Sequence, residues 1–148
     1  MKKALFYFLA FGAFTLGSCS SDDDSSSGNG SITANVNGVA RTFNDVEVIE
    51  HPYEEEGYTD LQIIAALPDD PEHFIELWVT EGDADPTAMW QFGYYLGNFY
   101  HESLDGFNSV VTENSNSAIK GTFSGQVRKY ETTEEPITIT NGSFNIER

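Results

Sequence analysis

The stretch ITANVNGVARTF, from Ile32 to Phe43, decides how this chain folds. Apolar and polar side chains alternate on both sides of Asn37-Gly38, and such alternation is typical of a half-buried β-strand. Asn and Gly both tolerate the positive φ angles that a two-residue type I′ hairpin turn requires. The stretch therefore predicts a β-hairpin in which Val36 pairs with Val39 and Ile32 pairs with Phe43.

The same two-residue period continues toward the C-terminus, with turn signals at short intervals and no long stretch of helical period. It indicates further strands at 45–50, 61–67, 74–80, 88–96, 107–113, 119–130 and 137–146, and an irregular segment at 98–106. About eight to nine strands without a helix predict an all-β domain. The expected architecture is an antiparallel β-sandwich or a flattened barrel.

Two of these strands are rich in large apolar side chains. In 74–80, Phe74 and Trp78 lie on the face opposite Ile75, Leu77 and Val79, which predicts a central strand covered on both sides. In 88–96 we assign the even positions from Trp90 to Leu96 to the core. Tyr95, Phe99 and Tyr100 lie off that stripe or beyond its end, so they are the candidates for exposed, ligand-facing rings.

The last strand contains a conflict of parity. Ile137 and Ile139 share one face, whereas Phe144 and Ile146 have the opposite parity. A β-bulge at Asn141-Gly142, with a positive φ at one of the two residues, would turn all four side chains inward.

The N-terminus reads as an export signal. Lys2 and Lys3 precede an uncharged run, 4–16, which is shorter than the roughly 20 residues needed to span a bilayer. The run ends in Leu16-Gly17-Ser18-Cys19, which resembles the lipobox of bacterial lipoproteins. The resemblance implies a signal peptide over 1–18 and acylation of Cys19, so that the mature protein is anchored to the outer membrane by lipid.

The segment behind Cys19 contains no apolar side chain as far as Ser31, so we expect a flexible tether over 19–31 and the domain over 32–148. Asp22, Asp23 and Asp24 resemble the acidic export signal of Bacteroidetes surface lipoproteins. That resemblance implies display on the cell surface, with the periplasmic face as the alternative.

Composition excludes several classes of function. Cys19 is the only cysteine, which excludes an intramolecular disulfide, a zinc site built on cysteines and a cysteine nucleophile. Without Lys2 and Lys3, the mature chain sets five basic residues against 24 acidic ones, a net charge of −19. This charge opposes binding to nucleic acid.

No motif indicates catalysis, and we do not expect an enzyme. The sequence lacks a nucleophile elbow and a phosphate-binding loop, and the three histidines, His51, His73 and His101, have no ligand partner at metal spacing. The acidic runs 69–72 and 81–85 offer oxygen ligands for calcium, but neither has EF-hand spacing. We therefore expect no cofactor, and solvated acidic loops rather than a calcium site.

Four short motifs occur in order behind the lipobox, namely Ile32–Gly38, Tyr94–Gly97, Gly121–Gly125 and Ile139–Phe144. Together they resemble a family of small, uncharacterised Bacteroidetes surface lipoproteins. The resemblance implies an all-β surface domain and assigns no catalytic or binding residues.

The function that we expect is a non-catalytic binding or interaction module with a glycan or a protein as its partner. The alternatives are a structural envelope lipoprotein without a ligand and a lipocalin-like carrier of an apolar ligand.

Overall fold

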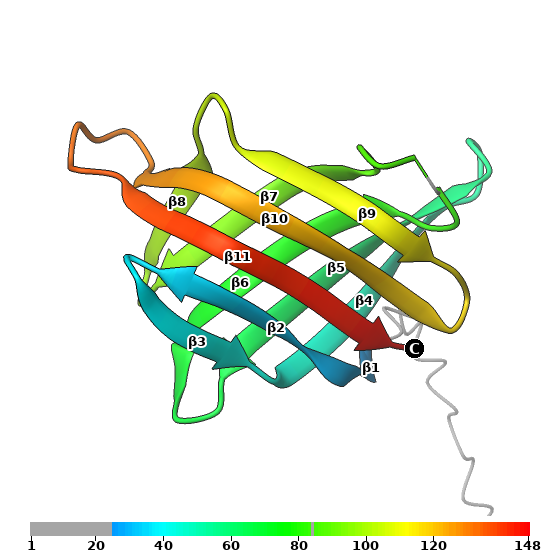
Figure 1. The fold of residues 1–148 in the computed structure, drawn as a ribbon. Helices are drawn as coiled ribbons and strands as arrows, with labels where there is room; N and C mark the ends of the chain where they lie inside the picture. Colours follow the sequence, from blue (N-terminus) through cyan, green and yellow to red (C-terminus); the bar gives the residue numbers. More distant parts are fainter. Residues whose placement is uncertain (1–24, 84) are drawn as a thin grey trace, which may run out of the picture.

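The computed structural model describes residues 25–83 and 85–148. Within them, eleven strands form one antiparallel sheet in the order β1-β4-β5-β6-β7-β8-β10-β11-β2-β3, with β9 paired to β10 (Figure 1). The strands are β1 (Ser25–Ser27), β2 (Asn29–Val36), β3 (Val39–Phe43), β4 (Asp45–Tyr53), β5 (Tyr58–Leu67), β6 (Asp70–Thr80), β7 (Met89–Leu96), β8 (Phe99–Ser103), β9 (Asn108–Asn114), β10 (Ala118–Lys129) and β11 (Ile137–Glu147). No helix in the described residues is long and apolar enough to cross a membrane.

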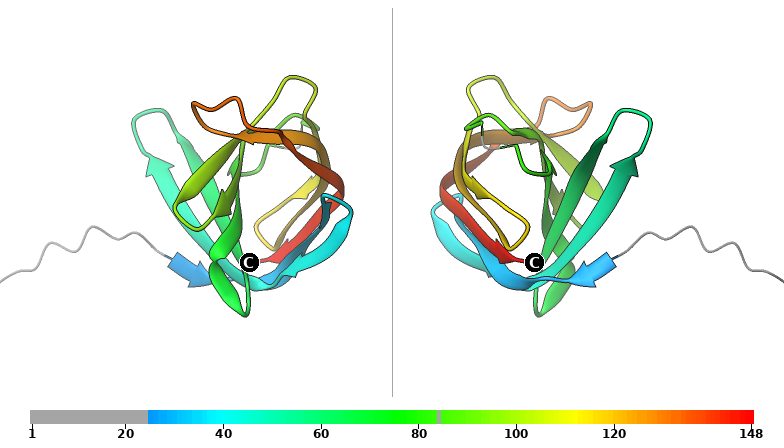
Figure 2. Two further views of the ribbon diagram at one scale, coloured as in Figure 1. Left: turned by 90° about the vertical axis from the view of Figure 1, so that its left-hand side faces the viewer. Right: turned by 90° about the vertical axis from the view of Figure 1, so that its right-hand side faces the viewer.

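The sheet curls until β2 and β3, at one end of the strand order, approach β4 and β5 near the other end. β1 pairs with β4 and β2 pairs with β11, although only Gly28 separates β1 from β2 in the chain. The amide of Gly28 donates to the carbonyl of Val46 at 3.1 Å, which holds this junction against β4. Seen end-on, the strands surround one interior in a flattened barrel (Figure 2). The predicted all-β antiparallel class is confirmed.

The domain begins earlier than the sequence indicates. Ser25–Ser27 pair with β4, and Asn29–Ser31 pair with the end of β11. The prediction of a flexible tether is therefore wrong for residues 25–31, because strand pairing uses main-chain groups and needs no apolar side chain. The signal peptide, Cys19 and Asp22, Asp23 and Asp24 lie outside the described residues.

The interior is filled by the inward-facing side chains of the strands. Leu61, Ile63, Ile75, Leu77 and Val79 are fully buried on β5 and β6. On the other side of the barrel the interior holds a row of phenylalanine rings, with centroids 4.5–6.4 Å apart: Phe92, Phe107, Phe123 and Phe144. This aromatic row packs the core between β7, β10 and β11.

The predicted first hairpin is confirmed. Asn37 and Gly38 have φ angles of 48° and 79°, as a type I′ turn needs. Val36 is paired with Val39 and Ile32 with Phe43, as expected from the alternation.

The bulge in the last strand is also present. Asn141 has a φ of 52°, and the pairing of β11 with β2 shifts register between Thr140 and Ser143. Ile139, Phe144 and Ile146 are buried, and Ile137 is half-buried.

Three details differ from the sequence-based expectations. The described chain contains eleven strands, partly because the segment expected to be irregular contains β8 and because β1 precedes the expected domain. Trp90 is 52% exposed instead of buried, because β7 bulges there and Met89 takes the inward position. The outer face of β6, expected to be covered, carries half-buried Phe74 and Trp78 with no described strand packed over them.

Candidate functional site

Aromatic side chains gather on the outer face of the sheet where β6, β7 and β8 lie side by side. In one row, Phe74 on β6 is paired with Tyr95 on β7, and Tyr95 with Tyr100 on β8. Trp78 is paired with Gln91 in a second row, and Glu76, Gly93 and Glu102 form the row between them. We call this surface the outer aromatic patch and define it by His51, Gln62, Phe74, Glu76, Trp78, Trp90, Tyr95, Tyr100 and Tyr130.

Glu76 is the centre of the patch. It faces outward on β6 but is only 7% exposed, because neighbouring rings cover it. Its Oε1 accepts hydrogen bonds from Gln62 Nε2 at 2.5 Å and from Trp78 Nε1 at 2.9 Å, and its Oε2 accepts from the Tyr95 hydroxyl at 2.8 Å. A buried carboxyl group is costly unless it is hydrogen-bonded in this way. These bonds in turn fix the orientation of two rings.

The rings also support one another. His51 stacks on Trp78 with centroids 4.9 Å apart, and its Nε2 lies 3.0 Å from Gln62 Oε1. Phe74 and Tyr95 stack nearly parallel, with centroids 4.2 Å apart and an interplanar angle of 11°. The patch is therefore ordered before any ligand arrives, which lowers the entropic cost of binding.

Gly93 gives the two tyrosines the space that they occupy. A Cβ atom on Gly93 would lie 3.0 Å from Tyr100 Cε2 and 3.1 Å from Tyr95 Cε2, closer than side chains normally pack. Only glycine at this position leaves both rings free to lean over β7.

The tyrosine hydroxyls are held in the protonated form. Burial raises the pKa of Tyr95, and the hydrogen bond to Glu76 and the charge of Glu76 raise it further. Burial also raises the pKa of Tyr100, assisted by the charges of Glu102 and Glu76. At neutral pH Tyr95 therefore keeps the proton that it donates to Glu76, and Tyr100 keeps a hydroxyl proton as a potential donor.

Two rings at the ends of the patch are open to solvent. Trp90 is 52% exposed, and its ring centroid lies 5.3 Å from that of Trp78. Tyr130, which follows β10, is 53% exposed, and its centroid lies 6.2 Å from that of Tyr100. Exposed aromatic rings on an ordered base are typical of a binding surface.

The structure brings together two of the three aromatic residues selected from sequence. Tyr95 and Tyr100 are half-buried neighbours with centroids 5.2 Å apart. Phe99 is 54% exposed, but it has the opposite parity on β8, and Lys129 Nζ lies 3.8 Å above its ring. Phe99 is therefore not part of the outer aromatic patch.

Sequence reasoning missed Glu76, Trp78 and Trp90 as site residues. The pattern that could have revealed the site is the pair Phe74 and Trp78 on one face of a strand whose other face is apolar. We interpret this pattern as a strand covered on both sides, although it also fits an aromatic surface. The exposure of Trp90 depends on a bulge that pairs Trp78 with Gln91 and Val79 with Met89, and the alternation alone does not predict such a bulge.

The three histidines do not form a metal site. His51 belongs to the patch, whereas His73 and His101 lie inside the barrel on either side of Tyr94. Within residues 25–83 and 85–148, no group of three or more His, Cys, Asp or Glu side chains is arranged to hold a metal ion.

The interior cluster is a hydrogen-bonded part of the core. His73 Nε2 is bonded to the Tyr94 hydroxyl, and His101 Nδ1 lies 3.2 Å from the Tyr94 carbonyl oxygen. Burial lowers the pKa of His73, with a contribution from Arg41, and raises the pKa of Tyr94 to about 12. Both groups are therefore neutral at neutral pH.

Comparisons of the chain with protein-family models, with curated proteins and with solved structures find no match.

Proposed function

We propose that this protein is a non-catalytic, glycan-binding lipoprotein of the outer membrane and that the outer aromatic patch is its binding surface. The observation that carries the proposal is Glu76, an almost fully buried carboxyl group on the outer face of a sheet. Its hydrogen bonds hold Trp78 and Tyr95 in position on a face over which no described strand packs.

The chemistry of the patch suits a sugar. The apolar face of a pyranose ring stacks on an aromatic ring, while its hydroxyl groups need nearby donors and acceptors. The patch offers both, since Trp90 and Tyr130 expose ring surface and Tyr95, Tyr100 and Gln91 supply polar groups between them. The net charge of −19 on the mature chain favours a neutral glycan over an acidic one.

The filled interior supports the patch as the site rather than a carrier function. Packed phenylalanine rings occupy the space in which a lipocalin-like carrier would hold its ligand. Trp90, by contrast, is exposed to solvent.

Tryptophan fluorescence tests the proposal directly, because the only two tryptophans of the chain, Trp78 and Trp90, both lie in the patch. We expect saturable changes in fluorescence when the purified chain is titrated with a matching member of a panel of short neutral oligosaccharides of glucose, xylose, galactose and mannose in α and β linkage. Tyr100→Ala should weaken binding about tenfold or more, the loss of about 1.4 kcal/mol of stacking and burial.

Phe99→Ala is the matched control, because Phe99 lies on the same strand and is well exposed but lies outside the patch. It should bind like the wild type. The proposal is wrong if no oligosaccharide of the panel gives a saturable response, or if Phe99→Ala and Tyr100→Ala weaken binding equally.

We further propose that Cys19 carries the lipid that anchors the domain. The support is the lipobox-like Leu16-Gly17-Ser18-Cys19 behind an uncharged run that is too short to span a bilayer. Cys19→Ser removes the thiol that is acylated, so uncleaved precursor should accumulate and no lipidated peptide should appear in mass spectra. A mature, unlipidated protein that begins at another residue in the wild type would contradict this proposal.

A further inference from the structure

A slot is recessed in the wall of the barrel beside the outer aromatic patch. β7 and β8 pair from Gly93 with Glu102 to Leu96 with Phe99, and beyond that pairing they diverge. The chain then bends toward β10, because Leu104 N donates to the Gln126 carbonyl at 2.9 Å. β9 continues along β10 and has no other strand partner among the described residues.

The slot is closed at both ends. The pairing of Gly93 with Glu102 closes one end, and the amide of Val111, which donates to the Pro86 carbonyl at 3.0 Å, closes the other. Between these ends, residues 89–92 of β7 have β6 as a strand neighbour on one side and open space on the other. A long extended peptide therefore has no continuous edge to pair with, whereas a compact ligand fits.

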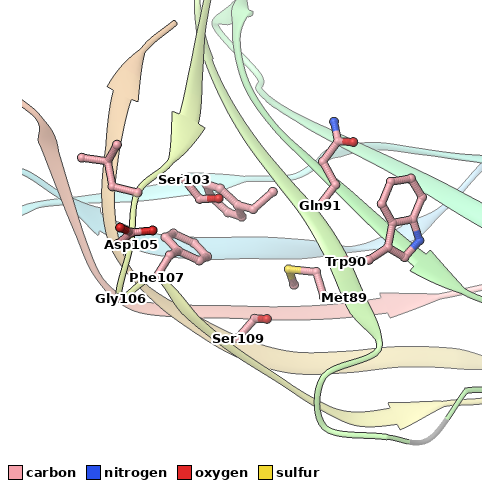
Figure 3. Close-up of a pocket in the computed structure, with 10 residues that line it drawn as sticks. Met89, Trp90, Gln91, Ser103, Asp105, Gly106, Phe107 and Ser109 are labelled. Atoms are coloured by element: carbon pink, nitrogen blue, oxygen red, sulfur yellow. The ribbon is translucent and has the colours of Figure 1, made fainter. Parts of the chain in front are cut away.

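The lining combines an apolar floor with a polar rim. Met89 and Phe107 face each other across the slot (Figure 3). The rim carries Gln91, Ser103, Asp105 and Ser109, and the slot, which is open to solvent, has a volume of about 380 Å³. This volume is within the range of small-ligand sites, and an apolar floor with a few polar groups beside it is typical of them.

Trp90 connects the slot with the patch. The bulge in β7 turns this residue outward, so that it lines the slot and also lies beside Trp78 of the patch. An oligomeric ligand that lies on the patch can therefore pass over the side chain of Trp90 and place its end in the slot.

We infer that the slot binds the terminal ring of the neutral glycan whose following units lie on the outer aromatic patch; this inference rests on the proposed function. The apolar face of the ring packs on Phe107 and Met89, and its hydroxyl groups bond to the polar rim. The slot sets the direction of the chain and requires an unmodified end.

The experiment fills the slot without touching the patch. Ser109 lines the slot on β9, so Ser109→Phe occupies the space of the ring. Thr112→Phe on the same strand is the matched control, because Thr112 is exposed and outside the slot. Affinity is measured with the full chain by tryptophan fluorescence, using the best oligosaccharide of the panel free and capped with a bulky group at either end.

We expect Ser109→Phe to lower affinity for the free oligosaccharide about tenfold or more, and Thr112→Phe to leave it unchanged. The wild type should discriminate against one capped end, and Ser109→Phe should lose that discrimination. Asp105→Ala, an exposed turn position at the rim, gives a second variant with a smaller risk to folding, and a several-fold loss is expected.

The outcomes separate the two ideas. If Tyr100→Ala weakens binding but Ser109→Phe and Asp105→Ala bind like the wild type and neither cap matters, the slot inference is wrong and the patch remains the site. If the wild type binds no oligosaccharide of the panel, the proposed function itself fails.

Discussion

At the scale of single residues, a few close approaches determine how the barrel is built. Gly142 shows this best, because a Cβ atom there would lie 2.5 Å from Phe123 Cδ2 and from the Phe123 carbonyl oxygen. The left-handed backbone of the bulge is at Asn141 rather than at Gly142. The need for glycine at 142 is therefore steric, because the ring of Phe123 packs directly against its Cα.

Gly142→Val should destabilise the domain by about 1–3 kcal/mol or more, because the new side chain must displace a packed ring or a strand backbone. Urea denaturation followed by fluorescence gives the free energy of unfolding. Asn145→Val on the exposed side of the same strand is the control and should stay within about 0.5 kcal/mol of the wild type. Equal stabilities of the two variants would contradict the steric explanation.

His73 predicts a dependence of stability on pH. Burial and Arg41 place its pKa in the folded state below the ordinary histidine value of 6.5, so the unfolded chain binds the proton more readily. This contribution to stability is complete above pH 6.5 and is lost as the pH falls from there through the folded pKa. NMR titration of the His73 ring should give a pKa below 6.5, and a value at or above it would refute the prediction.

At the scale of elements, the segment from Ser25 to Val36 closes the barrel. Its first part pairs with β4 and its second part with β11, so one stretch of chain joins two strands that are remote in the sheet order. Glycine at 28, between Val46 and Val48, allows the change of partner.

Removal of β1 should weaken this closure. A chain that begins at Gly28 loses the pairing of three serines with β4 and should be less stable by about 1–3 kcal/mol than a chain that begins at Ser20. A chain that begins at Ser25 keeps the strand and should match the longer one in urea denaturation. If all three chains unfold at the same urea concentration, β1 contributes nothing to the fold.

At the scale of the whole molecule, the domain presents one specialised face. The outer side of β6, β7 and β8 carries the outer aromatic patch, and the slot opens beside it, while the chain enters the barrel at β1 on the far side of the β4–β5 pair (Figure 2). For a protein tethered at its N-terminus, this arrangement leaves the patch accessible.

Surface display is the prediction at this scale. Replacement of Asp22, Asp23 and Asp24 by Ala should retain the protein on the periplasmic face, where protease added to intact cells cannot digest it. Digestion is followed by immunoblot, with lysed cells as the control for intrinsic susceptibility. Unchanged digestion of intact cells would show that the acidic cluster is only a linker.

Much of the fold follows from local sequence. The alternation sets which side chains face inward, and Asn37-Gly38 sets a turn and a register that are correct residue by residue. The parity conflict at Asn141-Gly142 predicts a bulge, because without one two large apolar side chains of this strand would face solvent. The outward direction of Tyr95 also follows from parity, whereas Tyr100 is a candidate only because it lies beyond the end of the inward-facing stripe.

By itself, then, the sequence determined the all-β class, the first hairpin, the last bulge and the outward direction of Tyr95, because each depends on neighbours within a few residues. Only the tertiary structure decided that serines 25–27 form a strand and that Trp90 turns outward. It also decided that Phe99 lies outside the patch and that Glu76 accepts hydrogen bonds from two aromatic side chains. Those outcomes depend on which strands meet across the sheet. Pairing between segments that are remote in the chain depends on how the whole sheet curls, and no local sequence pattern specifies it.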